Sequence, residues 1–199
     1  MPDHDLLRVV GRGSYGCVWL ARNRLLNHFH AVKLLCRSCR TRPENFEREL
    51  EGLRRFEPIS RRHPGFVQIL HVGLGNTGTF FYYVMELADD IQRGREVDPP
   101  TYAPRTLQSD RRARGRLPLD ECLRLGIHLA DALHHLHAAG FVHRDLKPSN
   151  IIFVDQTPKL ADVGLVGDDG HCETLIGTEG YIPPEGTGTC LSLIHISEP

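Results

Sequence analysis

The chain has 199 residues, of which 40% are hydrophobic and 25% charged, and its formal net charge is −1. This composition is typical of a globular protein, and the near-zero charge gives no support for binding to nucleic acid or to an acidic membrane surface. No apolar run approaches the roughly 20 residues that span a bilayer, and the first ten residues do not resemble a signal peptide. We therefore expect a cytoplasmic protein with no membrane segment in this chain.

The first third of the sequence is predicted to form strands with one helix. Pro43 precedes a stretch with helical periodicity, and Gly and Asn mark the turns between the apolar runs around it. The strands are expected at residues 6–10, 17–22, 30–35, 66–75, 78–80 and 81–87, and the helix at 44–56. Strands followed by helices favour an α+β fold.

The composition changes after this sheet. Residues 89–118 are rich in Pro, Arg and Asp, which predicts a linker with a short exposed helix and a solvated Arg cluster. A long helix is expected over 119–139, ended by Gly140. After the polar stretch 143–150 come an apolar strand at 151–154, a turn at 155–158 and a further strand from Lys159.

Three glycines, Gly11, Gly13 and Gly16, form the pattern G-x-G-x-x-G. Two unrelated nucleotide folds use this pattern, but here the third glycine is followed by a strand-like segment instead of a helix. The glycines therefore belong to the turn of an antiparallel hairpin. Such a hairpin is either a plain flexible turn or a lid over phosphates, because glycine lets backbone N–H groups approach closely.

Lys33 lies inside an apolar strand, on the same side as Ala31, and needs an anionic partner because burying an unpaired charge is costly. On the helix 44–56, the apolar residues form one stripe, and Glu49 falls within it. Glu47 and Glu51 fall outside the stripe. The sequence therefore predicts an ion pair between Lys33 and Glu49.

The stretch His143 to Asn150, HRDLKPSN, brings an acid, a lysine and an amide onto one short loop. Asp145 can accept a proton from a hydroxyl nucleophile, and Lys147 can neutralise charge on a transferring phosphoryl group. Asn150 offers a neutral oxygen to a hard cation, and Asp162 follows an apolar strand twelve residues later. Mg²⁺ prefers a few oxygen ligands of this kind together with phosphate oxygens.

At these residues the chain resembles a eukaryotic-type, or Hanks-type, serine/threonine protein kinase domain of bacterial-like character. The ordered motifs are GRGSYGCV, AVK at 31–33, HRDLKPSN, DVG at 162–164 and GTEGYIPPE. The resemblance implies a bilobal α+β fold with an antiparallel β N-lobe carrying one helix (1–87) and an incomplete, mostly helical C-lobe (88–190).

The resemblance also implies a role for each matching residue, with ATP and Mg²⁺ as cofactors and a protein Ser/Thr hydroxyl as acceptor. Asp145 would be the catalytic base, Lys147 the γ-phosphate contact, and Asn150 and Asp162 the metal ligands. The residues implied to surround the nucleotide are Gly11, Gly13, Gly16, Val18, Ala31, Lys33, Glu49, Met85, Glu86, Ala88 and Ile152.

Two positions depart from the family pattern. Val163 stands where the family usually has Phe, so it is expected to pack less against the helix of Glu49. Pro183 replaces Ala in the A-P-E element, which is tolerable. Arg144 suggests a site that accepts a phosphate on the activation segment, and Thr174 is the candidate phosphosite. No charged catalytic group is lost, although a non-catalytic nucleotide-binding pseudokinase or scaffold module is the alternative.

The end of the sequence is expected to be foreign to the family. Residues 191–199, LSLIHISEP, have no cap, no amphipathic period and no family counterpart, and they match a translated sequencing adapter. We interpret them as an artefact that follows a domain truncated after its activation segment. Such a fragment is expected to be inactive, poorly soluble and to expose apolar surface.

Cysteine and histidine could indicate metal, but their spacing argues against it. Cys36 and Cys39 form one C-x-x-C pair, a pattern found in redox-active sites and in half of a zinc site, but no second pair follows at zinc-ribbon spacing. We interpret them as reduced thiols. On the helix 119–139, His137 is predicted to pack on the apolar face with Leu119, Leu123 and Leu133. The histidines predicted to point elsewhere, without converging as ligands, are His128, His134 and His135.

Overall fold

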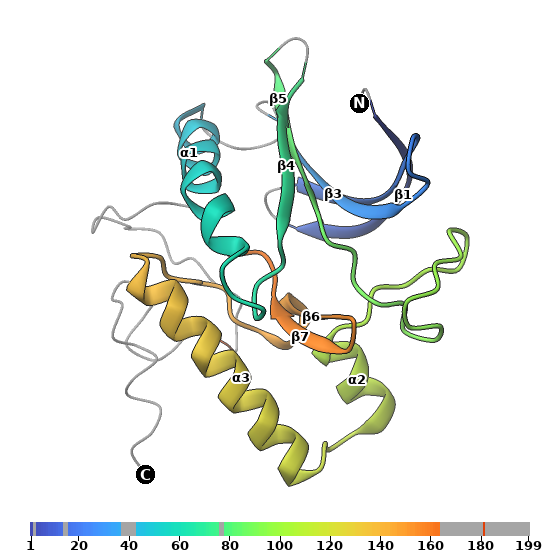
Figure 1. Cartoon of the computed structure of the whole chain (residues 1–199), viewed down its shortest axis with the longest axis vertical. Coiled ribbons are helices and arrows are strands. Elements are labelled where there is room, and N and C mark those ends of the chain that lie inside the picture. The colour runs from blue at the N-terminus through green and yellow to red at the C-terminus, as the bar shows by residue number, and fades with distance from the viewer. Residues whose placement is uncertain (2, 14–15, 37–42, 76–77, 164–180, 182–199) are drawn as a thin grey trace.

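The computed structural model has a five-stranded antiparallel sheet above a mostly helical part, with a small hairpin between them (Figure 1). It describes residues 1, 3–13, 16–36, 43–75, 78–163 and 181. Thr174, Pro183, Cys39 and the segment 191–199 lie outside the described residues. Among the described helices, none is both long and apolar enough to cross a membrane.

The sheet has the strand order β1-β2-β3-β5-β4. Its strands are β1 (His4–Gly13), β2 (Gly16–Asn23), β3 (Phe29–Cys36), β4 (Ile69–Leu74) and β5 (Phe80–Met85). The predicted strands are thus found with other bounds: the first is longer than expected, the strand predicted at 66–75 is shorter, and Phe80 continues directly into the strand predicted at 81–87, which ends at Met85. Alternation along β3 points Ala31, Lys33 and Leu35 to one face and Val32 to the other, where it packs with Ala21, Tyr82 and Val84.

Helix α1 (Pro43–Ser60) covers one face of this sheet and is longer than the predicted 44–56. Its apolar stripe packs against β3 and β5, and the rings of Phe46 and Phe81 meet edge to face with centroids 5.0 Å apart. The buried stripe consists of Phe46, Leu50, Leu53 and Phe56. The predicted periodicity of this helix is therefore confirmed, including the burial of Glu49 within the stripe.

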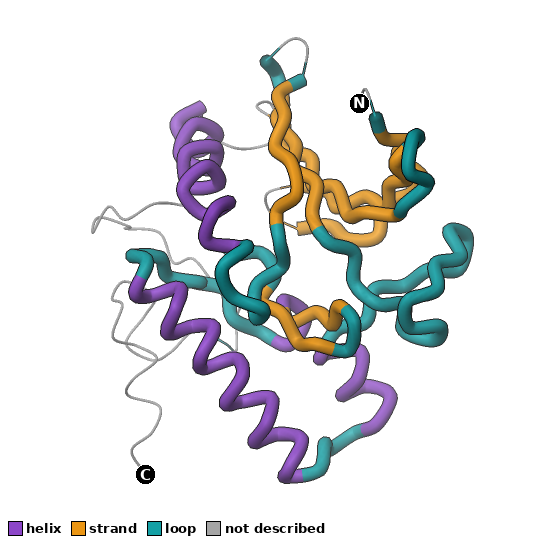
Figure 2. Tube along the Cα trace, viewed as in Figure 1, coloured by secondary structure: helices purple, strands orange, loops and turns teal. Residues whose placement is uncertain are grey.

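A long loop follows β5 and leads to α2 (Leu107–Arg114), the short helix predicted in the linker (Figure 2). Thr106 caps α2, because its hydroxyl accepts a hydrogen bond from the Ser109 N–H and the Ser109 hydroxyl accepts one from the Thr106 N–H. In the Arg cluster, Arg105 is paired with the buried Asp110, so this arginine is not part of a solvated face.

Helix α3 (Leu119–Ala138) packs by a different face from the one predicted. Ala132 and Leu136 are fully buried, whereas Leu119 and Leu123 are exposed. The prediction failed because this helix has apolar side chains on two faces, and only the one toward β7 and α1 has a partner among the described residues. His137 is half-buried. The expected exposed apolar surface is therefore present on α3.

A two-stranded hairpin completes the described structure, formed by β6 (Ile151–Val154) and β7 (Thr157–Leu160). Its turn consists of two residues, Asp155 and Gln156, both with positive φ, as hairpins with type I′ turns require. The turn predicted at 155–158 is longer than the observed one, because Pro158 belongs to β7. An edge strand tolerates proline.

Candidate active site

A cavity of about 530 Å³ lies between the sheet and the lower part of the molecule. It gathers most of the residues that the sequence predicted, from both ends of the described chain. The predicted residues that line it are Gly11, Val18, Ala31, Lys33, Glu49, Met85, Glu86, Ala88, Asp145, Lys147, Asn150, Ile152 and Asp162. Gly16 is not among the described residues that line the cavity, and Gly13 and Gly16 pair with each other at the tip of the β1–β2 hairpin.

The β1–β2 hairpin forms the roof of this cavity, with Val10, Gly11 and Val18 in its lining. Gly16 has a φ of +151, and a Cβ at this position would lie 2.2 Å from the Leu34 carbonyl oxygen. A larger residue therefore cannot replace Gly16 without moving β3. The predicted antiparallel hairpin is confirmed, and the glycine allows its close approach to the next strand.

Lys33 does not form the predicted ion pair with Glu49. Its Nζ donates to Oδ1 of Asp162 at 2.5 Å, and the lysine is buried. Burial by itself would lower the pKa of Lys33, but its electrostatic interactions with Tyr83, Asp162 and Glu49 and its hydrogen bond to Asp162 raise it. The prediction failed because Asp162, distant in sequence, competes with Glu49 for the one ammonium group.

Glu49 is buried, and among the described contacts it forms no ion pair with Lys33. Burial raises its pKa to about 7, and the charge of Lys33 offsets only part of this effect. A carboxyl group with such a pKa is partly protonated near neutrality, which lowers the cost of burying it.

The loop between His143 and Asn150 holds three predicted residues in mutual contact. Asn150 donates from Nδ2 to the carboxylate Oδ2 of Asp145 at 2.9 Å and to its backbone carbonyl at 2.8 Å. Lys147 Nζ lies 2.7 Å from the same Oδ2. Because both donations use Nδ2, the Oδ1 atom of Asn150 is the end oriented to accept a cation.

Backbone strain accompanies these side chains. Arg144 has a φ of 62 and Asp162 a φ of 53, in the left-handed region that non-glycine residues seldom adopt.

Desolvation would raise the pKa of Asp162, but the charge and hydrogen bond of Lys33 outweigh it and lower that pKa. Asp162 is therefore ionised at neutral pH, as a metal-binding carboxylate must be.

Glu86 and Tyr102 take part in the site in ways that sequence reasoning missed. The Glu86 carboxylate accepts hydrogen bonds from the buried Lys159 Nζ at 2.9 and 2.7 Å and from the Gln68 N–H. Tyr102 lines the cavity although it belongs to the stretch predicted to be a linker. The sequence indicated a role for Tyr102 only in that it is an aromatic residue among polar neighbours.

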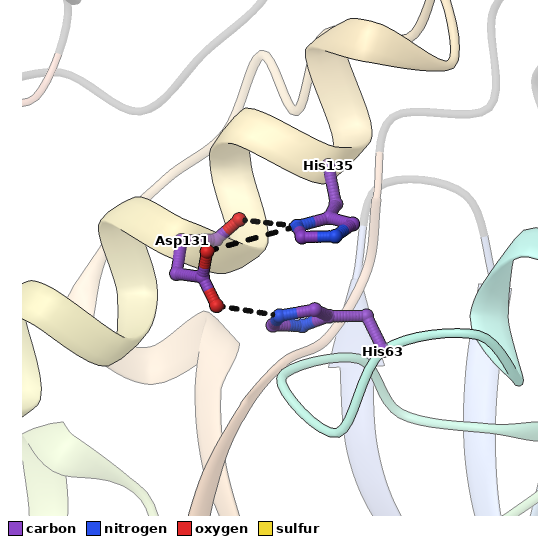
Figure 3. A group of neighbouring side chains, drawn as sticks. All are labelled: His63, Asp131 and His135. Atoms are coloured by element: carbon purple, nitrogen blue, oxygen red, sulfur yellow. Dashed lines mark hydrogen bonds and ion pairs between the residues drawn. The ribbon is translucent and has the colours of Figure 1, made fainter.

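A group of three side chains outside the cavity joins the α1–β4 connection to α3 (Figure 3). His63, which the sequence analysis overlooked, lies 2.9 Å from Asp131 Oδ2 through Nε2, and the rings of His63 and His135 are 4.4 Å apart. The Gly65 N–H donates to His63 Nδ1, so Nε2 must carry the proton. This tautomer suits a hydrogen bond to Asp131 but leaves no lone pair on His63 for a metal ion.

One other histidine of α3, His128, also differs from the expectation. His128 is not merely solvated, because its Nε2 lies 2.9 Å from the Pro158 carbonyl oxygen. His134 is exposed, as expected. Cys36 is exposed at the end of β3, and Val163 is buried in the main core despite its small size.

Comparison with known proteins agrees with this geometry. A protein kinase domain family model matches residues 4–191. CBL-interacting protein kinase 12 of Oryza sativa is 33% identical over 93% of this chain and 32% of its own length. Serine/threonine-protein kinase PknK of Mycobacterium tuberculosis is 32% identical over 91% of this chain and 15% of its own.

Serine/threonine-protein kinase H1 of Homo sapiens is likewise 32% identical, over 92% of this chain and 40% of its own length. The chain thus spans two fifths or less of these curated relatives. Because the family model matches nearly the whole sequence, the chain belongs to the protein kinase domain family.

Proposed function

We propose that this chain carries the nucleotide site and catalytic loop of a cytoplasmic protein kinase that transfers the γ-phosphate of ATP to Ser or Thr hydroxyls of a protein. The observation that supports this most is the convergence of Lys33, Asp145, Asn150 and Asp162 on one cavity of about 530 Å³. A cavity of this size suits a nucleotide. The match to serine/threonine kinases gives the expected acceptor.

In the proposed mechanism, Asp145 orients the acceptor hydroxyl and takes its proton, while Asn150 keeps the carboxylate in place through its Nδ2 donations. Lys147 neutralises charge on the transferred phosphoryl group. Mg²⁺, held by Asn150 Oδ1 and Asp162, would supply positive charge to the phosphates. Transfer breaks the bond between the γ-phosphorus and the β–γ bridging oxygen and forms one to the acceptor oxygen.

The walls of the cavity suit the base of the nucleotide. Val18 and Ala31 above and Ile152 below supply apolar surface for a flat ring, and Met85 closes the back. We assign the hydrogen bonds of the ring edge to the backbone of Glu86 and Ala88. The Glu86 side chain is held by Lys159, so it does not compete for that edge.

A non-catalytic nucleotide-binding module is the second candidate, and one observation favours it. Both acids of the site are paired with lysines, Asp162 with Lys33 and Asp145 with Lys147. A kinase must release these contacts when the nucleotide and the acceptor bind. A binding module could keep the contact between Asp145 and Lys147.

The test uses the full-length protein and measures ATP binding by calorimetry, with and without Mg²⁺, and phosphate transfer to a Ser/Thr peptide library. Asp145→Asn should retain ATP binding while its transfer rate falls by roughly 10²- to 10⁴-fold, the usual contribution of a general base. Asp155→Asn, an exposed acid on the β6–β7 turn, is the matched control. Equal transfer by Asp145→Asn and the original protein refutes the assigned base, binding without any transfer supports the module, and no ATP binding refutes both.

A further inference from the structure

The loop between β5 and α2 is folded back on itself and tied at its base by Asp90. One carboxylate oxygen of Asp90 accepts the N–H groups of Gln92 and Arg93, each at 2.9 Å, and the other accepts that of Ala103 at 2.8 Å. Asp90 is buried. Three backbone donors on one carboxylate fix the two ends of the segment 90–103 relative to each other.

Tyr102, near the end of this segment, connects it to the chain just after β5. Its side chain is 1% exposed, and its hydroxyl donates to the Ala88 carbonyl oxygen at 3.0 Å. Burial raises the pKa of Tyr102, so the hydroxyl keeps its proton and remains a donor. Both Tyr102 and Ala88 line the cavity. The ring therefore forms part of the wall at the place where the base of a nucleotide would enter.

Arg8 of β1 binds the same segment from the roof. Its guanidinium donates to the Pro100 carbonyl oxygen at 2.9 Å and also to the carbonyl oxygen of Tyr102. Residues 94 positions apart are thus joined by a charged donor. Arg8 precedes Val10 and Gly11, the first roof residues that line the cavity, by two and three positions. Because β1 is held at Arg8, the position of the β1–β2 hairpin over the cavity is fixed.

We propose that Arg8 and Tyr102 form a strap that holds the roof and the wall of the nucleotide cavity in binding geometry, which makes both of them positioning residues for the nucleotide. This inference rests on the proposed function, because it assigns the cavity to ATP. Hydrogen bonds from a charged donor are stronger than neutral ones, and a site that is already ordered loses less entropy on binding. The strap lies outside the catalytic motifs and joins β1 to the loop between β5 and α2.

The two strap residues are expected to affect different parts of the nucleotide. Arg8 holds the β1–β2 hairpin, whose glycines would face the phosphates. Arg8→Met should therefore weaken the binding of ATP more than the binding of adenosine. The Tyr102 hydroxyl holds the cavity wall beside the base, so Tyr102→Phe should weaken the binding of ATP and of adenosine equally. We expect ATP to bind about ten-fold more weakly to Arg8→Met, the equivalent of one lost interaction of about 1.4 kcal/mol. Arg8→Lys, which keeps one donor group, should fall between Arg8→Met and the original protein.

The experiment measures dissociation constants for ATP and adenosine with the 199-residue chain, at a temperature well below its unfolding midpoint. Arg22→Met is the matched control, because Arg22 is an arginine of the same sheet that pairs with Asp5. An ATP dissociation constant for Arg8→Met within two-fold of the original refutes the strap. Equal loss of ATP and adenosine affinity in Arg8→Met also refutes it, because a merely structural role would not discriminate between them.

Hydrogen exchange of the backbone amides of residues 9–13 keeps the test independent of nucleotide binding. The strap predicts faster exchange there in Arg8→Met than in the original protein or Arg22→Met. If the original protein binds neither nucleotide, the proposed function fails and this exchange measurement alone decides on the strap. Unchanged exchange in Arg8→Met then refutes it.

Discussion

Helices α1 and α3 are both long and amphipathic, yet they differ in how much of their apolar surface is covered. On α1, the four apolar residues of the stripe are between 0% and 7% exposed. On α3, Leu119, Leu123 and Ile127 are 75%, 57% and 72% exposed, while Leu136, on another face, is fully buried. An apolar stripe therefore indicates which face a helix can bury. Burial itself depends on a partner surface elsewhere in the structure.

The active site does not share this difference. The α1 side of the cavity is supported by a continuous core that includes Leu35, Phe81 and Val163. The loop that carries Asp145 packs against the same core through Leu146, and it is also held by hydrogen bonds, such as that from the Ala161 N–H to the Asn150 carbonyl oxygen at 2.8 Å.

The largest expected effect on stability compares the covered helix α1 with the partly uncovered helix α3. Leu53→Ala on α1 removes a fully buried side chain and should lower the free energy of unfolding by about 3 kcal/mol. Leu123→Ala on α3 should change it by less than about 0.5 kcal/mol, because that side chain is exposed. Urea denaturation of both variants measures the difference. Equal losses would show that the two helices are equally buried in solution.

The next effect concerns the acid inside the α1 stripe. The unfolded chain releases the Glu49 proton near pH 4.5, whereas the folded protein keeps it up to about pH 7. The folded state therefore binds more protons in this window, and Glu49 lowers the free energy of unfolding as pH rises, by about 2 to 3 kcal/mol in total. Glu49→Gln should lose this dependence.

The measurement is urea denaturation at pH steps from 4.5 to 8, read as the difference between the original protein and Glu49→Gln. The difference is needed because His143, whose pKa burial lowers, acts in the opposite direction near the same pH. Glu47→Gln, exposed on the same helix, is the control. Parallel curves for the original protein and Glu49→Gln would contradict the raised pKa.

A smaller effect is expected where α1 and α3 are joined. His63 is buried after the end of α1 and contacts Asp131 of α3 through Nε2. His63→Ala removes this contact and leaves the Gly65 N–H without its acceptor, so the free energy of unfolding should fall by about 1 to 2 kcal/mol. Denaturation measures it, with the exposed His134→Ala as control. An unchanged stability would mean that this contact does not hold α3.

Much of the fold could be predicted because local patterns determine it. The glycine hairpin, the burial of Glu49 and the short helix in the linker all follow from periodicity, turn residues and capping. The partner of Lys33 could not be predicted, because Asp162 reaches it only through the arrangement of the whole domain. Tyr102 and His63 were missed for the same reason. Their roles depend on Ala88, Arg8 and Asp131, with which they share no sequence motif.

The smallest expected change in stability tests the uncovered face of α3. Replacing Leu119, Leu123 and Ile127 together by Gln should change the free energy of unfolding by no more than about 1 kcal/mol, because exposed substitutions each have small effects. It should raise the concentration at which the chain stays monodisperse in light scattering, since a contiguous apolar surface promotes association. Leu136→Gln, on the buried face, is the contrasting control and should unfold the helix. A large loss of stability in the triple variant would show that this face of α3 is covered in solution.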